Sequence, residues 1–371
     1  MSHRRTSKHQ LGTGRGRMPA EPITHSFELR LNRALNDAGM LLMISIGHRT
    51  GLLTTLDGAP PLTSTELARW TGLTERYVRE WLNAMVTARV VAFDADAGTY
   101  RLPPEHADLL TNQGRLNRAV LAQFVPMMGL VENDILQCFR EGGGVPHGRY
   151  PRFHHIMAEQ SGQTVLRALF DRILPLAPDL PARLETGIRV LDVGCGRGRI
   201  PIVMAQRFPE SRFTGIDLST DAIEWARHQA YVTGLDNIEF QVRDLSDFDQ
   251  TAAPGRFELV TSFDAIADQA KPGAVLGGMR RSLTDDGVSL IQEIRAASAP
   301  EQNVDHPLGA FLYALSVTHC LPVSLGRDGE GLGAMWGREK AMEYLERAGF
   351  GTIESHTLRN DIHNEYFVCR L

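Results

Sequence analysis

The sequence contains few cysteines and no long hydrophobic run. Its four cysteines, Cys138, Cys195, Cys320 and Cys369, form no Cys-x-x-Cys pair and lack zinc-site spacing, which argues against a disulfide framework and a structural metal. No apolar stretch approaches the roughly 20 residues that cross a bilayer, and the N-terminus lacks the apolar region of a signal peptide. We therefore expect a soluble cytoplasmic protein that does not act at a membrane.

Clustered basic residues are scarce outside the N-terminus. The 371-residue chain has a formal net charge of −5, although residues 1–17 carry five Lys and Arg residues and no acid. Residues 18–371 therefore carry −10, which argues against a nucleic-acid partner because such binding depends on clustered Lys and Arg. We interpret residues 1–22 as a disordered basic leader.

Residues 23–104 begin with a helical pattern. Apolar residues recur at helical spacing from Ser26 to Ile46, which predicts an amphipathic helix, and a second short helix is expected over Gly47–Leu53. Thr63 and Glu66 have the spacing of a capping box, which marks the start of a further helix. The apolar face of the first helix fits either the core of this domain or a second subunit.

The same region ends with a predicted hairpin. The segments Val90–Phe93 and Thr99–Leu102 read as strands that flank a loop containing Asp94 and Asp96. Helix, turn, helix and hairpin is the order of a winged helix, whose second helix reads DNA in many proteins. Here the acids of Glu75–Trp81 nearly balance its arginines, so a structural or dimer-forming role is favoured.

The rest of the chain is organised around residues 189–199. Apolar residues lead into an acid, then Gly194, Gly196 and Gly198 alternate with other residues, and a helical run follows. Glycine reaches positive φ and lets a ligand lie on the backbone, so this turn is suited to holding a ligand. A dinucleotide fingerprint needs a glycine where Arg199 stands, so a nicotinamide cofactor is disfavoured.

Acids end the next two strands as well. Asp217 closes the strand Phe213–Leu218, where a carboxylate can accept hydrogen bonds from both hydroxyls of a ribose. Asp244 and Leu245 follow the strand Ile238–Arg243, where they can bind an adenine amine and cover its ring. Together these residues predict a ligand that contains a nucleoside.

These motifs resemble the class I S-adenosylmethionine-dependent methyltransferases. The match is carried by Val190–Gly198, by the acids after the next two strands, and by Phe257–Asp264, the strand that lines the methyl-transfer centre, and it covers roughly residues 150–371. It implies an α/β fold with a Rossmann-like seven-stranded sheet and S-adenosylmethionine as cofactor. The cofactor-binding residues that it implies are Asp192, Gly194, Gly196, Gly198, Asp217, Leu218, Asp244, Leu245 and Phe263.

The two-part layout is similar to that of the plant-type O-methyltransferases and of a bacterial group of winged-helix small-molecule methyltransferases. Tyr77–Leu82, Tyr100–His106 and Gly331–Gly337 carry the bacterial likeness. We expect residues 105–180 to form a helical linker and part of the substrate pocket, and residues 181–371 to form the cofactor domain. Candidate pocket residues are Tyr150, Phe153, His154, His155 and Met157.

The chain departs from these families at one position. Plant-type O-methyltransferases have a histidine before an aspartate just after the fourth strand, and here Ala267 precedes Asp268. Our preferred substitute base is His319, with Asp264, Asp268 and Glu293 as carboxylate candidates. Related α-keto-acid C-methyltransferases hold a metal with two histidines, and the alanine argues against a metal here.

The leading interpretation is a homodimeric enzyme, joined through its N-terminal helices, that methylates a small molecule by in-line displacement. Two alternatives stay open: a DNA-binding winged-helix regulator that senses S-adenosylmethionine, and, suggested by Ala267, a methyltransferase-like protein that transfers no methyl group. The sequence does not choose between oxygen, nitrogen and carbon as the methyl acceptor.

Overall fold

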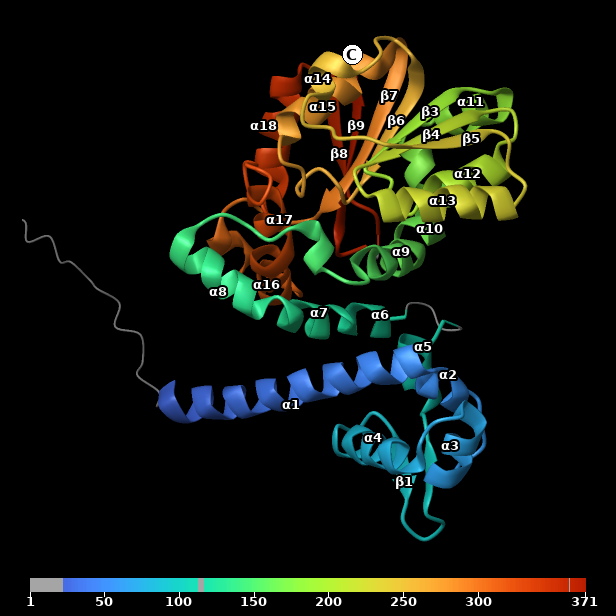
Figure 1. The fold of residues 1–371 in the computed structure, drawn as a ribbon, viewed down its shortest axis with the longest axis vertical. Coiled ribbons are helices and arrows are strands. Elements are labelled where there is room, and N and C mark those ends of the chain that lie inside the picture. Colours follow the sequence, from blue (N-terminus) through green and yellow to red (C-terminus); the bar gives the residue numbers. More distant parts are fainter. Residues whose placement is uncertain (1–22, 113–116, 360) are drawn as a thin grey trace, which may run out of the picture.

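The computed structural model describes residues 23–112, 117–359 and 361–371. Figure 1 shows a small N-terminal part of helices and one hairpin, a central layer of helices, and a twisted sheet with helices on both faces. The basic leader predicted for residues 1–22 lies outside the described residues. The domain boundaries stay a prediction.

The N-terminal part has the element order expected of a winged helix. Its buried core includes Leu53, Leu67, Trp81 and Leu82, which come from three of its helices. The two short strands pair antiparallel, as a wing requires. Its elements are α1 (Ile23–Thr50), α2 (Leu52–Leu56), α3 (Ser64–Thr71), α4 (Glu75–Thr87), β1 (Ala92–Asp94) and β2 (Thr99–Arg101).

The start of the second helix differs from the prediction over Gly47–Leu53, which is wrong at that end. α1 continues to Thr50, and α2 begins at Leu52. Gly51 lies between them with a φ of 77°, the left-handed conformation that commonly ends a helix. A Cβ added at Gly47 would lie 2.5 Å from the Trp81 ring, so this glycine lets α1 and α4 approach closely.

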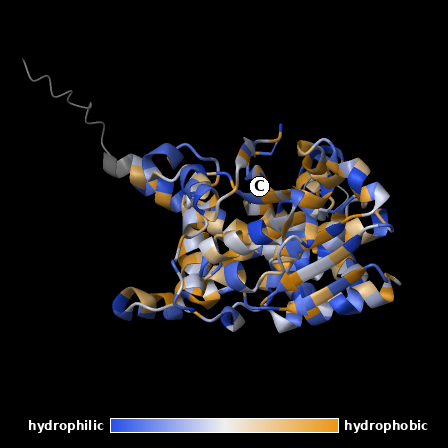
Figure 2. Cartoon of the chain, turned by 90° about the horizontal axis from the view of Figure 1, so that it is seen from above, coloured by the Kyte–Doolittle hydropathy of each residue, from blue (hydrophilic) through white to orange (hydrophobic). Residues whose placement is uncertain are grey.

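The N-terminal half of α1 has exposed apolar residues. Phe27, Leu31 and Leu35 are 51%, 50% and 73% exposed. Figure 2 shows hydrophobic residues mixed with hydrophilic ones along this part of the helix, next to the grey trace. Its apolar residues therefore do not belong to the core of this domain.

The central layer joins α5 (Pro104–Leu110), α6 (Ala119–Ala122), α7 (Phe124–Leu130) and α8 (Glu132–Glu141) to two later segments. The first is α9 (Phe153–Gln163) with α10 (Val165–Ala168). The second runs through α16 (Gly309–Leu315), a π-helical turn at Ser316–Cys320, and α17 (Leu321–Leu325). Buried residues of all these segments except α5, α10 and the π-helical turn share one core, so most of the layer packs as a unit.

None of the described helices is by itself long and apolar enough to cross a membrane. The stretches 119–130 and 132–141 reach that length only together, and they are bent by 55°.

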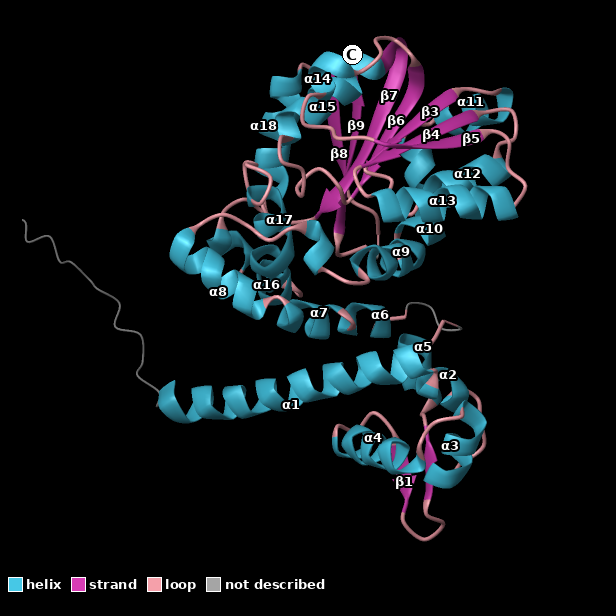
Figure 3. Ribbon diagram, in the orientation of Figure 1, coloured by secondary structure: helices cyan, strands magenta, loops and turns pink. Residues whose placement is uncertain are grey.

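The sheet has seven strands in the order β5-β4-β3-β6-β7-β9-β8, which confirms the predicted fold class. Figure 3 shows the strands fanning out between the helices. The five strands from β5 to β7 are parallel, and β9 runs antiparallel to both of its neighbours. The strands are β3 (Arg189–Val193), β4 (Arg212–Asp217), β5 (Ile238–Val242), β6 (Phe257–Phe263), β7 (Leu283–Ile294), β8 (Thr352–His356) and β9 (Asn364–Arg370).

Both faces of the sheet are buried, because successive side chains of a strand point to opposite sides. Leu191 of β3 packs in the core formed with α14, α15 and α18, whereas its neighbour Val190 packs in the core formed with α11 and α12. On β9, Phe367 packs in the first of these cores and its neighbour Tyr366 packs in the second. The covering helices are α11 (Leu180–Thr186), α12 (Arg199–Arg207), α13 (Thr220–Val232), α14 (Phe248–Thr251), α15 (Pro272–Ser282) and α18 (Gly337–Ala348).

The strand order creates a crevice at one edge of the sheet. β3 lies between β4 and β6, so the chain leaves β3 and β6 toward opposite sides. In open parallel sheets, ligands bind outside the carboxyl ends of the strands at such a point.

We predict that Thr63→Ala lowers the free energy of unfolding by about 1 kcal/mol. Thr63 closes the predicted capping box: its hydroxyl accepts from the Glu66 amide (3.2 Å), and its own amide donates to the Glu66 carboxylate (2.8 Å). Thr74 is a matched control, because it precedes α4 without a side-chain cap hydrogen bond. Urea unfolding followed by circular dichroism should give a smaller loss for Thr74→Ala, and equal losses would contradict this account of the cap.

Candidate functional site

A cavity of about 570 Å³ lies at the carboxyl ends of the central strands. Loops after β3, β4, β5 and β6 form one wall, and the segment from His147 to Val165 forms the other. Seven of the nine residues predicted to bind the cofactor line it: Asp192, Gly194, Gly196, Asp217, Leu218, Leu245 and Phe263. Gly198 and Asp244 are not in this wall.

The loop after β3 is tied to the end of β4. The Gly196 amide donates to one carboxylate oxygen of Asp217 (2.8 Å), and the Ser219 amide donates to the other (2.8 Å). Around Gly196, a Cβ would meet only the His154 ring nitrogen, at 3.9 Å, so the backbone here faces open space in the cavity. A ligand can therefore lie directly against this part of the loop.

Gly198 serves packing instead. Its φ is 65°, and an added Cβ would lie 2.4 Å from the Phe240 ring of β5 and 3.0 Å from Ala226 of α13. The glycine thus lets the start of α12 lie close against the neighbouring strand and helix. The sequence alone does not show whether this glycine lets a ligand approach the backbone or lets the helix pack closely.

Asp244 forms an ion pair with Arg327. Its carboxylate accepts from Arg327 (2.8 Å) and from the Ser246 amide (2.9 Å). Burial raises the pKa of this carboxyl, but these hydrogen bonds outweigh the effect and leave the pKa below its usual value. Arg327, which the sequence analysis missed, lines the cavity itself. Binding of adenine by Asp244 stays a prediction.

Asp192 is buried at the centre of the site. Burial, together with the nearby charge of Asp217, raises its pKa to about 7, while a hydrogen bond from the Thr261 hydroxyl (2.6 Å) opposes that shift. Burial therefore moves the titration of this carboxyl from the acidic range toward neutral pH.

The five residues predicted to lie in a pocket, Tyr150, Phe153, His154, His155 and Met157, all line the large cavity. His147, which the sequence analysis missed, lies beside them with its ring 4.6 Å from that of His154. Burial lowers the pKa of His147 to about 4, with a smaller contribution from His154, so the ring is neutral at physiological pH. The wall opposite the glycine loop therefore combines aromatic and imidazole rings with Arg152, and the His147 imidazole adds no further positive charge to it.

A second cavity of about 90 Å³ adjoins the first. Its far walls are apolar side chains of the central layer, among them Leu121, Phe124, Phe311 and Leu315. The two cavities share five lining residues: Phe153, Met157, Thr164, Asp264 and Asp268. A ligand in one cavity would therefore lie next to a ligand in the other.

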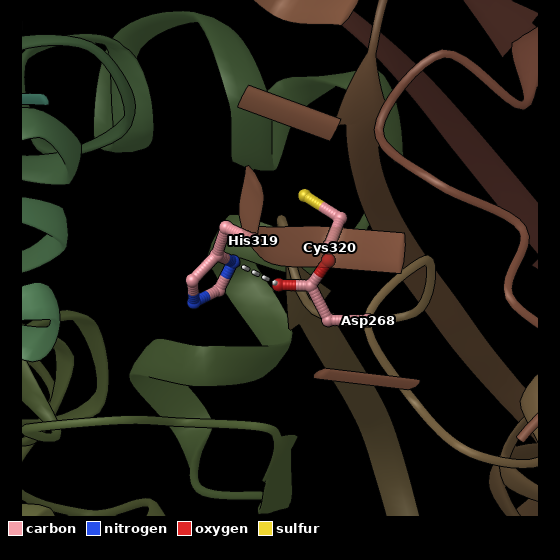
Figure 4. Close-up of side chains that lie close together, drawn as sticks. All are labelled: Asp268, His319 and Cys320. Carbon is pink, nitrogen blue, oxygen red and sulfur yellow. Dashed lines mark ion pairs between the residues drawn. The ribbon is translucent and has the colours of Figure 1, made fainter. Parts of the chain in front are cut away.

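His319 and Asp268 face each other beside this shared wall (Figure 4). The His319 Nδ1 atom lies 3.7 Å from a carboxylate oxygen of Asp268, and the ring stacks on Phe153 with centroids 3.7 Å apart. His319 lines the second cavity but not the first, is 1% exposed, and neither ring nitrogen has a hydrogen-bond partner among the described residues. Burial holds its pKa well below the usual value, so the ring is neutral.

Two further carboxyl groups, those of Asp264 and Glu293, line the small cavity with this pair. Burial raises the pKa of Asp268 to about 6 and that of Asp264 to about 7. Asp264 also has a φ of 55°, a conformation that non-glycine residues adopt rarely and that occurs at functional sites. Glu293 accepts from the Ile266 amide (3.0 Å) and from Trp336 (3.2 Å), so it holds the loop after β6 in place.

Two protein families match the chain. Residues 38–112 match an Rv2258c-like winged HTH domain, and residues 184–349 match a methyltransferase domain. A ubiquinone biosynthesis O-methyltransferase of Actinobacillus pleuropneumoniae is 32% identical over 111 residues, which are 29% of this chain and 46% of that protein. The chain spans less than half the length of the curated relatives that it matches.

Solved structures share the whole architecture. The mitomycin 7-O-methyltransferase MmcR has a TM-score of 0.68 at 18% identity, with 94% of this chain and 99% of that chain covered. Human N-acetylserotonin methyltransferase, solved in complex with SAM, has a TM-score of 0.66 at 16% identity, with 97% and 99% covered. These likenesses show a common fold that includes both parts of the chain.

Replacing Gly198 with alanine should lower the free energy of unfolding by about 2–4 kcal/mol, because the new Cβ combines backbone strain with overlap on Phe240. Gly234→Ala separates the two effects, since Gly234 also has positive φ but has nothing within 4 Å of its Cβ position. We expect it to cost only about 1 kcal/mol. Denaturant titration measures both variants, and a similar loss for both would refute the packing role of Gly198.

Proposed function

The chain joins a winged helix-turn-helix domain to a methyltransferase domain, and we propose that it is an S-adenosylmethionine-dependent methyltransferase of a small molecule. The single observation that carries this proposal is the pair of adjoining cavities, one beside the glycine loop and one apolar, with Asp264 and Asp268 in their common wall. A methyl donor in the first cavity would meet a methyl acceptor in the second.

The large cavity suits the cofactor. Asp217 ends β4 and Leu218 follows it, where a ribose would lie, and Leu245 would cover an adenine ring. The segment from Tyr150 to His154, which carries aromatic rings and Arg152, would then lie across the cavity from the glycine loop. Cofactor bound here supplies an activated methyl group, and the chain's residues align it and exclude water.

The small cavity suits an apolar acceptor with an ionisable hydroxyl. One curated relative is a ubiquinone biosynthesis O-methyltransferase, and MmcR is named a mitomycin 7-O-methyltransferase, which favours oxygen as the acceptor. A hydroxyl attacks well only after it loses its proton, so the site needs a base. That base must border the small cavity.

His319 is our candidate for this base, because this chain has Ala267 where the plant-type O-methyltransferases have a histidine. The ring is neutral, so Nε2 can accept the hydroxyl proton while Nδ1 faces the Asp268 carboxylate, which would stabilise the imidazolium that forms. The 3.7 Å separation is longer than a hydrogen bond, and such contacts commonly tighten when substrate binds. Asp264 is a second carboxyl within the same wall.

We assign the winged-helix domain an architectural role. On α4, Arg76 pairs with Glu80 and Arg79 pairs with Glu75, so the arginines available to contact phosphate are already neutralised. The exposed apolar residues on the N-terminal half of α1 favour a homodimer formed through the N-terminal helices. All four cysteines are free, as in a protein of the reducing cytoplasm, where we place the enzyme.

Calorimetric titration with S-adenosylmethionine and S-adenosylhomocysteine tests the cofactor site. We expect micromolar binding that weakens at least roughly 100-fold in Asp217→Ala, because the variant loses the ribose acceptor and the support of the Gly196 amide. Asp236→Ala removes the same charge from an exposed position and should bind normally. Failure of both ligands to bind the native chain would end the methyltransferase proposal.

Release of S-adenosylhomocysteine in the presence of a panel of small phenols and hydroxy acids tests catalysis. With an accepted substrate, His319→Gln should lower kcat by roughly 10²- to 10⁴-fold while cofactor affinity stays unchanged. Because the base works only when its carboxylate partner is ionised, kcat/KM should rise with pH from about 5 to 8, through the raised pKa of Asp268 at about 6. Asp268→Asn should lose this rise, and an unchanged profile would exclude Asp268 from the proton transfer.

A further inference from the structure

The small cavity is lined by three acids and by no side chain with a fixed positive charge. Asp264, Asp268 and Glu293 line it, and no Lys or Arg of the described residues does. Arg118 donates to His363, which lines the cavity, but does not line it itself. Among the ion pairs of the described chain, none joins a Lys or Arg to the three acids. Buried charges are ordinarily paired, so this cavity lacks a cation.

Asp264 is the acid that is available to a ligand. Both carboxylate oxygens of Glu293 already accept hydrogen bonds from the protein, and Asp268 faces His319. Asp264 lines both cavities and has a φ of 55°. Backbone strain of this kind gathers at ligand-binding and catalytic sites. A ligand in the small cavity can therefore meet the Asp264 carboxyl.

Two buried atoms near Asp264 are acceptors without a donor. Gln292 donates from Nε2 to Asn364, whose own amide donates to the Asp361 carboxylate, so Gln292 Oε1 is fixed as an acceptor. This residue is 1% exposed and lines the large cavity, and Oε1 has no partner among the described residues. The neutral His319 ring likewise has one nitrogen that can only accept, and neither of its nitrogens has a partner there. Both atoms need a ligand that donates hydrogen bonds.

The acids of the cavity also repel one another. The charge of Asp268 adds to burial in raising the pKa of Asp264, and the charges of both add to burial in raising the pKa of Glu293. A cation among them would remove this repulsion. The rings of Phe124 and Phe311 line the same cavity with centroids 6.1 Å apart, and the faces of such rings attract cations.

We propose that the methyl acceptor is an apolar molecule with a basic nitrogen, and that Asp264 binds this protonated nitrogen while the hydroxyl of the molecule faces His319. An ammonium group only donates, as the acceptors beside Asp264 require, and its hydrogen bonds to a carboxylate are among the stronger ones in proteins. This inference rests on the proposed function and adds the chemical class of its substrate. It assigns Asp264 to substrate binding and leaves His319 to the chemistry.

The test compares two probes of nearly the same shape, benzylamine, which is protonated at neutral pH, and benzyl alcohol, which carries no charge. Isothermal titration of the full chain, saturated with S-adenosylhomocysteine, measures their affinities. We expect the amine to bind at least about ten-fold more tightly than the alcohol, as a charge-assisted hydrogen bond predicts. Equal affinities, or binding of neither probe, would overturn the proposal.

Variants locate the preference. Asp264→Asn should reduce the advantage of the amine to within about two-fold, and asparagine tolerates the positive φ of this position. Asp328→Asn is a matched control, because Asp328 also has a positive φ, 53°, but is exposed and lines neither cavity. It should leave the preference intact. A preference that survives Asp264→Asn, or that is lost in Asp268→Asn alone, would remove Asp264 from substrate binding.

A second titration, without S-adenosylhomocysteine, separates the substrate from the cofactor, which has an ammonium group of its own. Preference for the amine in the free chain that disappears in the saturated chain would show that Asp264 serves the cofactor, and would overturn the substrate class. Normal binding of S-adenosylhomocysteine with no preference for the amine would refute the substrate class and leave the proposed function. Preference for the amine without binding of S-adenosylhomocysteine would refute the cofactor assignment and leave an amine-binding cavity.

Discussion

The position of β3 between β4 and β6 is the constraint on which the site depends. Because the connections from β3 and β6 leave the sheet toward opposite faces, the backbone parts at their carboxyl ends and opens a crevice. The loop after β3 fills part of this crevice, and the Gly196 amide fixes that loop to Asp217. The central helical layer then closes the crevice from the other side.

Burial sets the chemistry of this enclosed space. Four carboxyl groups, those of Asp192, Asp264, Asp268 and Glu293, have raised pKa values because low-polarity surroundings disfavour their charged forms. The same burial keeps His319 and His147 neutral. The site consequently holds several groups able to exchange protons without carrying the full charge that exposed groups would have.

Features set by local pattern were predictable from the sequence. Strand-end acids such as Asp217 follow from the alternation of strands and helices, and the capping box of α3 follows from the spacing of Thr63 and Glu66. Features that depend on tertiary contact were not. Gly198 meets Phe240, and Asp244 meets Arg327 across 83 residues, so neither contact can be read from local spacing. The hydrogen bond from the Arg118 guanidinium to the His363 Nε2 atom joins residues 245 positions apart, so local spacing gives no sign of it.

The two cavities draw their walls from different parts of the chain. The large cavity is lined by loops of a single sheet and by the segment from His147 to Val165, whereas the far wall of the small cavity combines α6 and α7, the segment around α16, and the residues just before and at the start of β9. Substitutions in these three segments can reshape the small cavity without touching the glycine loop. Because different segments line the two cavities, related chains can change the residues of the small cavity and keep those of the large one.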